Sequence, residues 1–348
     1  MIVLGADMHK SSHTIAAVSA TAGELLGGET VQVGDRGFSA ALDWARSLGA
    51  KRVWALEDCR HVSGAFERFL LACGERVVRV ATHLMAGERR GGRDRGKSDR
   101  IDALAVARAA LREGVDALPS AQLAGVELDI RLLVDHRERL IRSRVAINND
   151  PLWHLHDLWP ELKLPGSALF SKKWSSRVAR RLARAEQSAR VRIARDELRR
   201  LRELTVAANE LETEIAELVG QAAPHLLDEP GFGPLTTAKL LGEIAGAGRF
   251  ATEAKLARAA GVAPIPVSSG NTHRHRLDRG GNRQLNTAIH RIALTRARCD
   301  PETRDYIARK RAEGKTGLEA MRCLKREVVP LAVELRGGGP VISERLRA

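Results

Sequence analysis

The sequence predicts an α/β domain followed by mainly helical regions, a fold class of α/β plus α. Short apolar and β-prone runs, separated by glycine-containing turns, occupy most of residues 1–80. Beyond Gly114, apolar residues recur instead at the three- and four-residue spacing of a helix. The length of 348 residues is enough for two or three domains, each with its own core. We therefore expect three segments, 1–113, 114–222 and 223–348.

The first segment opens with three strands and then alternates helices and strands. The apolar run from Ile2 ends in the acid Asp7, and Ser98 is placed to cap a helix after the arginine- and glycine-rich stretch 87–96. The expected strands are Ile2–Asp7, Thr14–Ser19, Thr30–Val33, Arg52–Glu57 and Val77–Val80, and the expected helices are Gly37–Leu48, Val62–Ala72 and Ser98–Leu111. Three antiparallel strands followed by alternating units are typical of the ribonuclease-H-like fold.

The middle segment is predicted to be helical, with a first helix from Val126 to Ile147. A later polar stretch carries a heptad seam of apolar residues: Leu201, Leu204, Ala208, Leu211, Ile215 and Leu218. The seam lasts under three heptads, so it supports a helical hairpin and a coiled-coil dimer contact about equally. Between these helices, the proline- and tryptophan-containing residues 153–176 indicate an ordered connector.

The third segment begins near Pro224 and is expected to be mainly helical. Gly231 and Gly233 form a tight turn that opens a helix, as in a helix-hairpin-helix, where exposed amides and a helix N-terminus suit a phosphate. The alternative is an ordinary turn between two helices.

The charge balance favours a polyanionic partner. Lys and Arg outnumber Asp and Glu by 57 to 43, which gives a net charge of +14. The four cysteines show no CxxC spacing, so neither a zinc site nor a disulfide framework is indicated. Apolar runs fall far short of the roughly 20 residues of a membrane span, and no secretory leader is recognised. We expect a cytoplasmic protein that binds nucleic acid mainly through arginine.

Four carboxylates are candidates for a metal site. Asp7 and Glu57 each end a predicted strand, where α/β folds place functional groups, although Asp58 could replace Glu57. Asp99 and Asp102 stand three apart and so share one helix face. Four acids at close range would repel one another unless divalent cations neutralised them. Two Mg²⁺ ions about 4 Å apart, with Mn²⁺ as the alternative, are the usual solution in phosphoryl transfer.

A second candidate site lies near the C-terminus, where Ser268 and Ser269 occupy a glycine-bounded loop. A basic run follows, ahead of a helix that begins near Asn282; its members are Arg274, Arg276, Arg279 and Arg283. A serine hydroxyl needs activation to act as a nucleophile, and arginines would balance a pentavalent phosphate. The alternative is a DNA-contact loop without chemistry.

The motifs GADMHK, ALEDCR, KSDRIDA, GVAPIPVSSG and RGGNRQL resemble the DEDD transposases of the insertion sequence one-ten family, relatives of the Piv-type invertases. The likeness covers nearly the whole chain. It implies a RuvC-like domain joined by a coiled coil to a C-terminal transposase domain. By this resemblance Asp7, Glu57, Asp99 and Asp102 would bind metal, and Ser269 would be the nucleophile, with Ser268 as the alternative.

The resemblance also implies partners: donor and target double-stranded DNA, an element-encoded guide RNA, and further copies of the chain in a dimer or tetramer. It implies a bacterial protein associated with the nucleoid. The sequence INNDPLWHLHDLWP departs from the plainer helix of relatives. The competing functions are a RuvC-like junction nuclease that cuts without rejoining, an actin-like sugar kinase, and a non-catalytic nucleic-acid scaffold. The kinase lacks support because glycine-rich phosphate turns are absent after the first strand.

Overall fold

The computed structural model describes residues 1–57, 60–82, 84–85, 98–118, 120, 125–244, 250, 252–269, 272–276, 278 and 281–333. The chain divides into two compact units. Unit 1 comprises Met1–Ala124 and Ala245–Gly281, and unit 2 comprises Gly125–Ile244 and Asn282–Ala348. The chain therefore passes from one unit to the other three times. The expected division into three consecutive segments stays a prediction.

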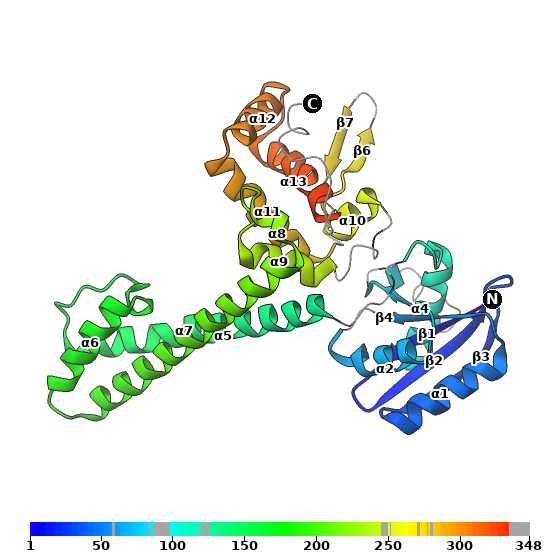
Figure 1. The fold of residues 1–348 in the computed structure, drawn as a ribbon, viewed down its shortest axis with the longest axis horizontal. Helices are drawn as coiled ribbons and strands as arrows, with labels where there is room; N and C mark the ends of the chain where they lie inside the picture. The colour runs from blue at the N-terminus through cyan, green and yellow to red at the C-terminus, as the bar shows by residue number, and fades with distance from the viewer. Residues whose placement is uncertain are drawn as a thin grey trace. The chain divides into compact units, whose positions relative to one another are not determined.

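Unit 1 is built on a five-stranded sheet of order β3-β2-β1-β4-β5 (Figure 1). Its elements are β1 (Ile2–Met8), β2 (Ser12–Ser19), β3 (Leu25–Gln32), α1 (Asp35–Leu48), β4 (Arg52–Glu57), α2 (Arg60–Ala72), β5 (Val77–Val80), α4 (Asp99–Glu113), α10 (Glu253–Ala259), β6 (Ile265–Ser269) and β7 (Thr272–Arg276). The first three strands are antiparallel, whereas β4 runs parallel to β1 and β5 parallel to β4. This order and these directions confirm the expected ribonuclease-H-like arrangement.

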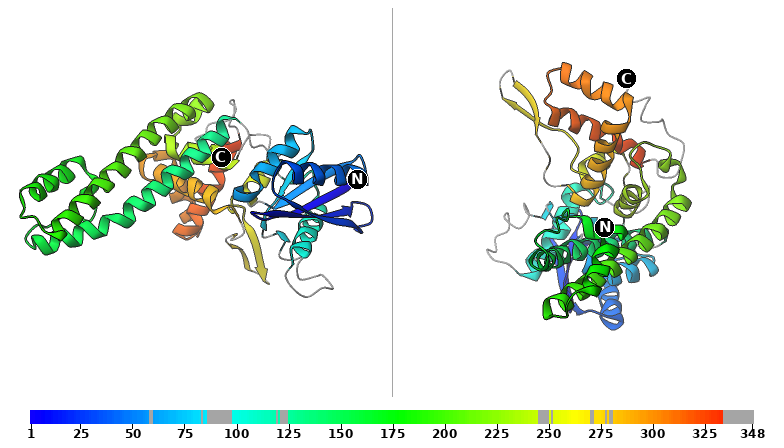
Figure 2. Two further views of the ribbon diagram at one scale, coloured as in Figure 1. Left: turned by 90° about the horizontal axis from the view of Figure 1, so that it is seen from below. Right: turned by 90° about the vertical axis from the view of Figure 1, so that its left-hand side faces the viewer.

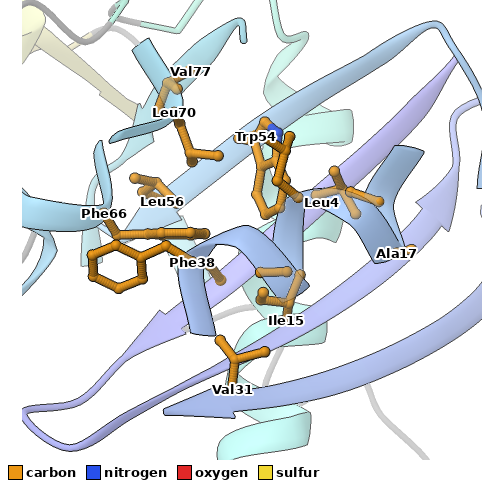
Figure 3. Packing of buried hydrophobic residues seen from close by; sticks show 14 of the residues in the cluster. Leu4, Ile15, Ala17, Val31, Phe38, Trp54, Leu56, Phe66, Leu70 and Val77 are labelled. Atoms are coloured by element: carbon orange, nitrogen blue, oxygen red, sulfur yellow. The ribbon is translucent and has the colours of Figure 1, made fainter. Parts of the chain in front are cut away.

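Helices cover both faces of this sheet, so its central strands are buried on both sides. Leu4 and Trp54 point to the face where residues of α1 and α2, such as Phe66, complete one apolar cluster (Figure 3). Val3 and Ala55, one position along each strand, join the cluster that α4 completes on the opposite face. This two-sided burial explains why β1 and β4 are continuous apolar runs in the sequence.

The third strand is longer than expected, because it begins at Leu25 instead of Thr30. Gly27 and Gly28, which interrupt its β-prone pattern, lie inside the strand and pair with β2. The strand is at the edge of the sheet and most of its side chains are exposed. Few of its positions therefore need an apolar residue, so the alternation of apolar and polar residues did not show where the strand begins.

Unit 2 contains a long antiparallel hairpin of α5 and α7, which pack together along their length (Figures 1 and 2). Its elements are α5 (Val126–Leu158), the 3-10 turn η1 (Ala168–Phe170), α6 (Lys172–Arg184), α7 (Ala189–Ala222), α8 (Pro224–Leu227), α9 (Pro234–Ile244), α11 (Arg283–Cys299), α12 (Pro301–Ala312) and α13 (Gly317–Val333). Of the heptad seam, Leu201, Ala208 and Ile215 are buried in α7. A helical hairpin within one chain accounts for this burial, and the dimer contact stays a prediction.

The helix α5 continues to Leu158, past the end expected at Ile147. It includes Pro151, a residue that normally ends a helix because it lacks the amide hydrogen. Tertiary contacts outweigh this cost: Pro151 is buried, and Asn148 Nδ2 donates a hydrogen bond of 2.8 Å to the carbonyl of Gly166. Among the described helices, none combines the length and apolarity needed to cross a membrane.

Candidate functional site

Asp7 and Glu57 lie side by side at the carboxyl ends of two parallel strands. The register pairs Ala6 of β1 with Leu56 of β4, so the next residues are Asp7 and Glu57, and paired strands are about 4.8 Å apart. Asp7 shares its side of β1 with Val3, and Glu57 shares its side of β4 with Ala55, which both belong to the α4-side cluster. Both carboxylates therefore face α4. Asp58, the alternative to Glu57, lies outside the described residues.

The other two acids lie in the first turn of α4. Ser98 caps this helix as expected, since its side chain accepts a hydrogen bond from the backbone N–H of Ile101. The cap fixes where the helix begins and so puts Asp99 and Asp102 in its first turn. Asp99 remains 57% exposed, whereas Asp102 is only 6% exposed. The acids offer both a buried and an accessible carboxylate.

Gly5 lets α4 lie close to β1. A Cβ at this position would fall 2.3 Å from the carbonyl oxygen of Ala103 and 2.4 Å from the amide nitrogen of Ala107. Both atoms belong to the α4 backbone, so the strand and helix touch without an intervening side chain. This close approach brings the first turn of α4 toward the end of β1.

His9 joins two of the acids and was not expected from the sequence. Its Nε2 lies 3.0 Å from Oδ2 of Asp7 and 3.4 Å from Oδ1 of Asp99. One ligand atom from each of Asp7, His9 and Asp99 can be chosen so that all lie within 4.8 Å of one another. The signal that could have found it is the spacing of Asp7-Met8-His9, an acid and an imidazole two residues apart at a strand end.

The electrostatics of the cluster favour a bound cation. Burial raises the pKa of Asp7; the His9 imidazole opposes this rise, and the charges of Asp102 and Asp99 add to it. A divalent cation among these groups would relieve both the desolvation and the repulsion. The donors are mainly carboxylate oxygens, the ligands that Mg²⁺ and Mn²⁺ prefer. The donor chemistry thus fits the metal expected from the sequence.

The serine segment forms a hairpin of two short strands, β6 (Ile265–Ser269) and β7 (Thr272–Arg276), instead of the expected loop. The strand β6 was missed because its five residues include Pro266 and two serines, which do not favour a strand, and a glycine follows. Ser269 ends β6 and pairs with Thr272. The side chains of Ser268, Ser269 and Arg274 lie outside the described residues, so their roles stay predictions.

Gly231 has a packing role that the sequence did not reveal. It adopts φ +88°, and a Cβ there would lie 2.8 Å from the carbonyl oxygen of Ile292 and 3.2 Å from Cγ of Arg296 in α11. The turn before α9 is therefore pressed against α11. Gly233 is exposed, and Thr236 Oγ1 lies within hydrogen-bonding distance of the carbonyl oxygens of both glycines. The preceding helix α8 has only four residues, so a helix-hairpin-helix is not confirmed.

The predicted arginines occupy different surroundings. Arg276 ends β7 and is exposed. Arg283 is the exposed first residue of α11, which begins where expected because the Asn282 side chain accepts hydrogen bonds from two backbone amides. Arg279 lies outside the described residues. Contact of these arginines with nucleic acid stays a prediction.

Two protein-family models match the chain. A model of DEDD transposases, described as "Transposase", matches residues 4–160, and a second, described as "Transposase IS116/IS110/IS902 family", matches residues 223–308. Together they cover more than two thirds of the chain. The first contains Asp7, Glu57, Asp99 and Asp102, and the second contains Ser269.

Proteins of three insertion elements are similar in sequence. A protein of IS110 from Streptomyces coelicolor is 37% identical over 127 residues, which is 36% of this chain and 31% of that protein. This match spans about a third of that relative's length. A protein of IS900 from Mycobacterium paratuberculosis is 27% identical across 80% of this chain and 81% of its own. A protein of IS116 from Streptomyces clavuligerus is 25% identical across 94% and 92%.

Solved structures of RuvC from Thermus thermophilus also match, one of them in complex with a Holliday junction substrate. They are 16% identical to this chain, with TM-scores of 0.27 and 0.28. They cover 35% of this chain and 99% and 100% of their own. So slight a likeness carries no argument about the fold, which rests on the strand order described above.

Proposed function

Because the chain belongs to the IS110/IS116 family of DEDD transposases, a family of enzymes that recombine DNA by phosphoryl transfer, we propose that its catalytic metal ions bind at Asp7, Glu57, Asp99 and Asp102. The observation that supports this most directly is the meeting of Asp7, His9 and Asp99 within 4.8 Å, beside Glu57 on the neighbouring strand. The carboxylates come from three elements that the sheet and the Gly5 contact hold together.

Each acid has a distinct part in this proposal. Asp7 and Glu57 hold metal from the ends of adjacent strands, whereas Asp99 and Asp102 approach from α4. When bound, two divalent cations would polarise the reacting phosphate and steady the attacking and leaving oxygens. His9 donates to the Asp7 carboxylate and orients it, which makes His9 a positioning residue.

The finer part of the proposal is that Ser269 is the nucleophile, with Ser268 as the alternative. The serine oxygen loses its proton and forms a bond to phosphorus while the bond from phosphorus to a sugar oxygen breaks. The released sugar oxygen takes up one proton and becomes a hydroxyl, so the protons balance. The phosphoserine ester conserves the energy of the phosphodiester, so the reverse step with another strand's hydroxyl rejoins DNA without ATP. The arginines that follow in the sequence, Arg274, Arg276, Arg279 and Arg283, would balance the charge of the transition state.

Donor and target DNA would be the substrates, and an element-encoded RNA would choose the sequences. This division of labour is consistent with a chain rich in arginine and poor in aromatic residues, which suits phosphate contact more than base reading. The active assembly would be a dimer or tetramer. The relationship to Piv-type invertases belongs to the same proposal.

Substitution of one acid tests the metal site. Asp102→Asn should lower Mg²⁺-dependent strand cleavage by roughly 100-fold or more, because a ligand charge is lost without a change of shape. Asp43→Asn, an exposed acid on α1, is the matched control and should leave cleavage unchanged. Equal activity of the two variants would contradict the metal site, and a chain without any Mg²⁺-dependent activity would be a nucleic-acid scaffold.

Substitution of the serine separates recombination from simple cleavage. Ser269→Ala should abolish both covalent protein–DNA adducts and recombinant product while DNA binding persists. Ser268→Ala is measured beside it, and loss of adducts and product in this variant instead of Ser269→Ala would assign the nucleophile to Ser268. If both variants still cut DNA and the wild type forms no adduct, the chain is a RuvC-like nuclease and the serine only contacts DNA.

A further inference from the structure

The positive charge of the chain is concentrated at one place in unit 2. Residues 172–200, which form α6 and the start of α7, contain 11 Lys and Arg against 3 Asp and Glu. This short stretch therefore supplies more than half of the chain's net charge of +14. Figure 1 shows α6 at the end of the α5–α7 hairpin that is remote from α9. None of the arginines predicted to contact nucleic acid lies in this stretch.

The two faces of α6 differ sharply. Ser175, Val178 and Leu182 are buried, and the last two belong to the apolar cluster that α6 shares with α5, η1 and α7. The exposed side carries Lys173, Arg177, Arg180 and Arg184, spaced four, three and four residues apart. At this spacing they lie within about 60° of one another around the helix axis and extend over about 16 Å. We call these four residues the α6 stripe.

Three acids near this end of the hairpin form ion pairs with arginines outside the stripe. Glu161 pairs with Arg181, Asp157 with Arg190, and Asp196 with both Arg199 and Arg200. By contrast, within the described part of the chain no carboxylate lies within ion-pair distance of any residue of the α6 stripe. The guanidinium of Arg177 lies 5.4 Å from the Trp174 ring centre.

Such a stripe is unfavourable for the isolated helix. Like charges three and four residues apart repel one another, and here nothing in the described surroundings neutralises them. The start of α7 extends the positive surface, with exposed Arg192 beside a hollow of about 620 Å³ that Arg195 and Arg199 also line. A polyanion laid along the helix would convert this repulsion into attraction.

We propose that the α6 stripe binds the phosphodiester backbone of duplex nucleic acid. A straight row of about 16 Å runs alongside about five phosphates of one strand of a duplex. The stripe offers cations and no aromatic platform, so it grips the backbone without reading bases. None of the four stripe residues belongs to the proposed acid site or to the serine segment, so this proposal does not depend on the proposed chemistry.

The salt dependence of binding by the full chain tests this proposal. The variant Lys173→Gln/Arg180→Gln/Arg184→Gln removes three exposed charges but keeps the stacking of Arg177 on Trp174. The control Arg36→Gln/Arg46→Gln/Lys51→Gln removes three exposed charges from unit 1, two in α1 and one directly before β4. Both are compared with wild type in the metal chelator EDTA, so that no cleavage occurs, on a short duplex of random sequence.

Each lost phosphate contact lowers the magnitude of the slope of log affinity against log salt by about 0.9 on duplex DNA. The stripe variant should therefore lose between about 2 and 3 from this slope, and the control less than about 1. Parallel titrations with duplex DNA, duplex RNA and a single strand distinguish the sources of the backbone. Equal slopes for the stripe variant and the control would mean a merely solvated or protein-binding face and would overturn the proposal, as would a loss confined to the single strand.

Discussion

His13 is a polar side chain in the middle of an apolar core. It is fully buried, its ring is stacked with that of Phe38 at a centroid distance of 5.7 Å, and Phe66 lies 5.3 Å away. Its Nδ1 donates to the carbonyl of Ser12, whereas its Nε2 has no hydrogen-bond partner. Burial lowers the pKa of this imidazole from its ordinary value of 6.5. The ring is therefore a neutral, flat core residue.

Acid should destabilise the protein through His13. The unfolded chain takes up a proton near pH 6.5, whereas the folded chain does so only at lower pH, so stability is present above this range and is lost as pH falls through it. His13→Phe keeps a ring in place but cannot take up a proton. Its unfolding free energy should therefore fall less steeply with pH than that of the wild type, by up to about 1.4 kcal/mol per pH unit. Urea unfolding between neutral and mildly acid pH measures it. The exposed His225→Gln is the control, and equal pH slopes for the two variants would contradict the assignment.

The candidate acids show what sequence could predict at this scale. Asp7 and Glu57 were found because strand ends are visible in an apolar pattern, and Asp99 and Asp102 because their spacing sets a shared helix face. His9 was missed because it follows the strand, in a turn whose geometry the pattern does not describe. The spacing of Asp7 and His9 could indicate a contact between these two residues, but it could not reveal that the imidazole also lies beside Asp99.

At the scale of elements, the contact between β1 and α4 decides whether the acids meet. Gly5→Ala would put a Cβ 2.3 Å from the Ala103 carbonyl oxygen, so the helix must move away from the strand. We expect a loss of about 1–3 kcal/mol in unfolding free energy and a weaker thermal stabilisation by Mg²⁺. Gly27→Ala is the matched control in the same sheet, since its nearest atom would be 3.6 Å away. Unchanged Mg²⁺ stabilisation in Gly5→Ala would show that α4 does not position the site.

A buried ion pair joins α2 to β5. Arg79 Nη2 donates to both carboxylate oxygens of Glu67 at 2.9 Å, and both side chains are almost completely buried. Glu67→Gln should cost about 3–5 kcal/mol, because it leaves the guanidinium charge buried with weaker compensation. The double variant Glu67→Leu/Arg79→Met should cost less than the single one. Denaturant unfolding measures both.

An exposed pair of the same unit provides the control for that comparison. Arg76 and Asp116 are 46% and 87% exposed, so Asp116→Asn should change stability by less than about 1 kcal/mol. We expect the cost of burying the two charges to offset most of their attraction. A double variant less stable than Glu67→Gln would contradict this, because it would mean that the attraction exceeds the cost of burial.

Helices and strands were predicted best where burial makes apolar residues recur at a regular spacing along the sequence. The central strands and the start of α4 match the sequence closely, because apolar residues must fill both faces of the sheet. The continuation of α5 through Pro151 could not be predicted, since packing against distant residues, including the Asn148 contact with Gly166, outweighs the local preference. The hairpin of β6 and β7 was missed for a different reason, because two five-residue strands carry too few positions to show a period.

At the scale of the whole molecule, each unit combines stretches that are far apart in the sequence. The stretch that contains Ser269 belongs to unit 1, although more than a hundred residues of unit 2 separate it from the acids along the chain. The spacing of apolar residues along the sequence cannot predict that a later segment joins the first unit, because this depends on contacts between distant segments. This is why consecutive segments were the natural expectation from sequence.

The two-unit architecture predicts a localised response to metal. Ions that bind the acid site only when it is folded lower the population of the opened unit 1, and the effect grows with ion concentration. At an ion concentration ten times the dissociation constant, the opening measured by hydrogen exchange should be about tenfold less frequent. Hydrogen exchange of the core amides of β1 and β4 should therefore slow in Mg²⁺, whereas exchange in the α5–α7 hairpin should not. Asp102→Asn should abolish the effect and Asp43→Asn should retain it. Slowing in neither unit would contradict the metal site, and equal slowing in both would show that the two units open together.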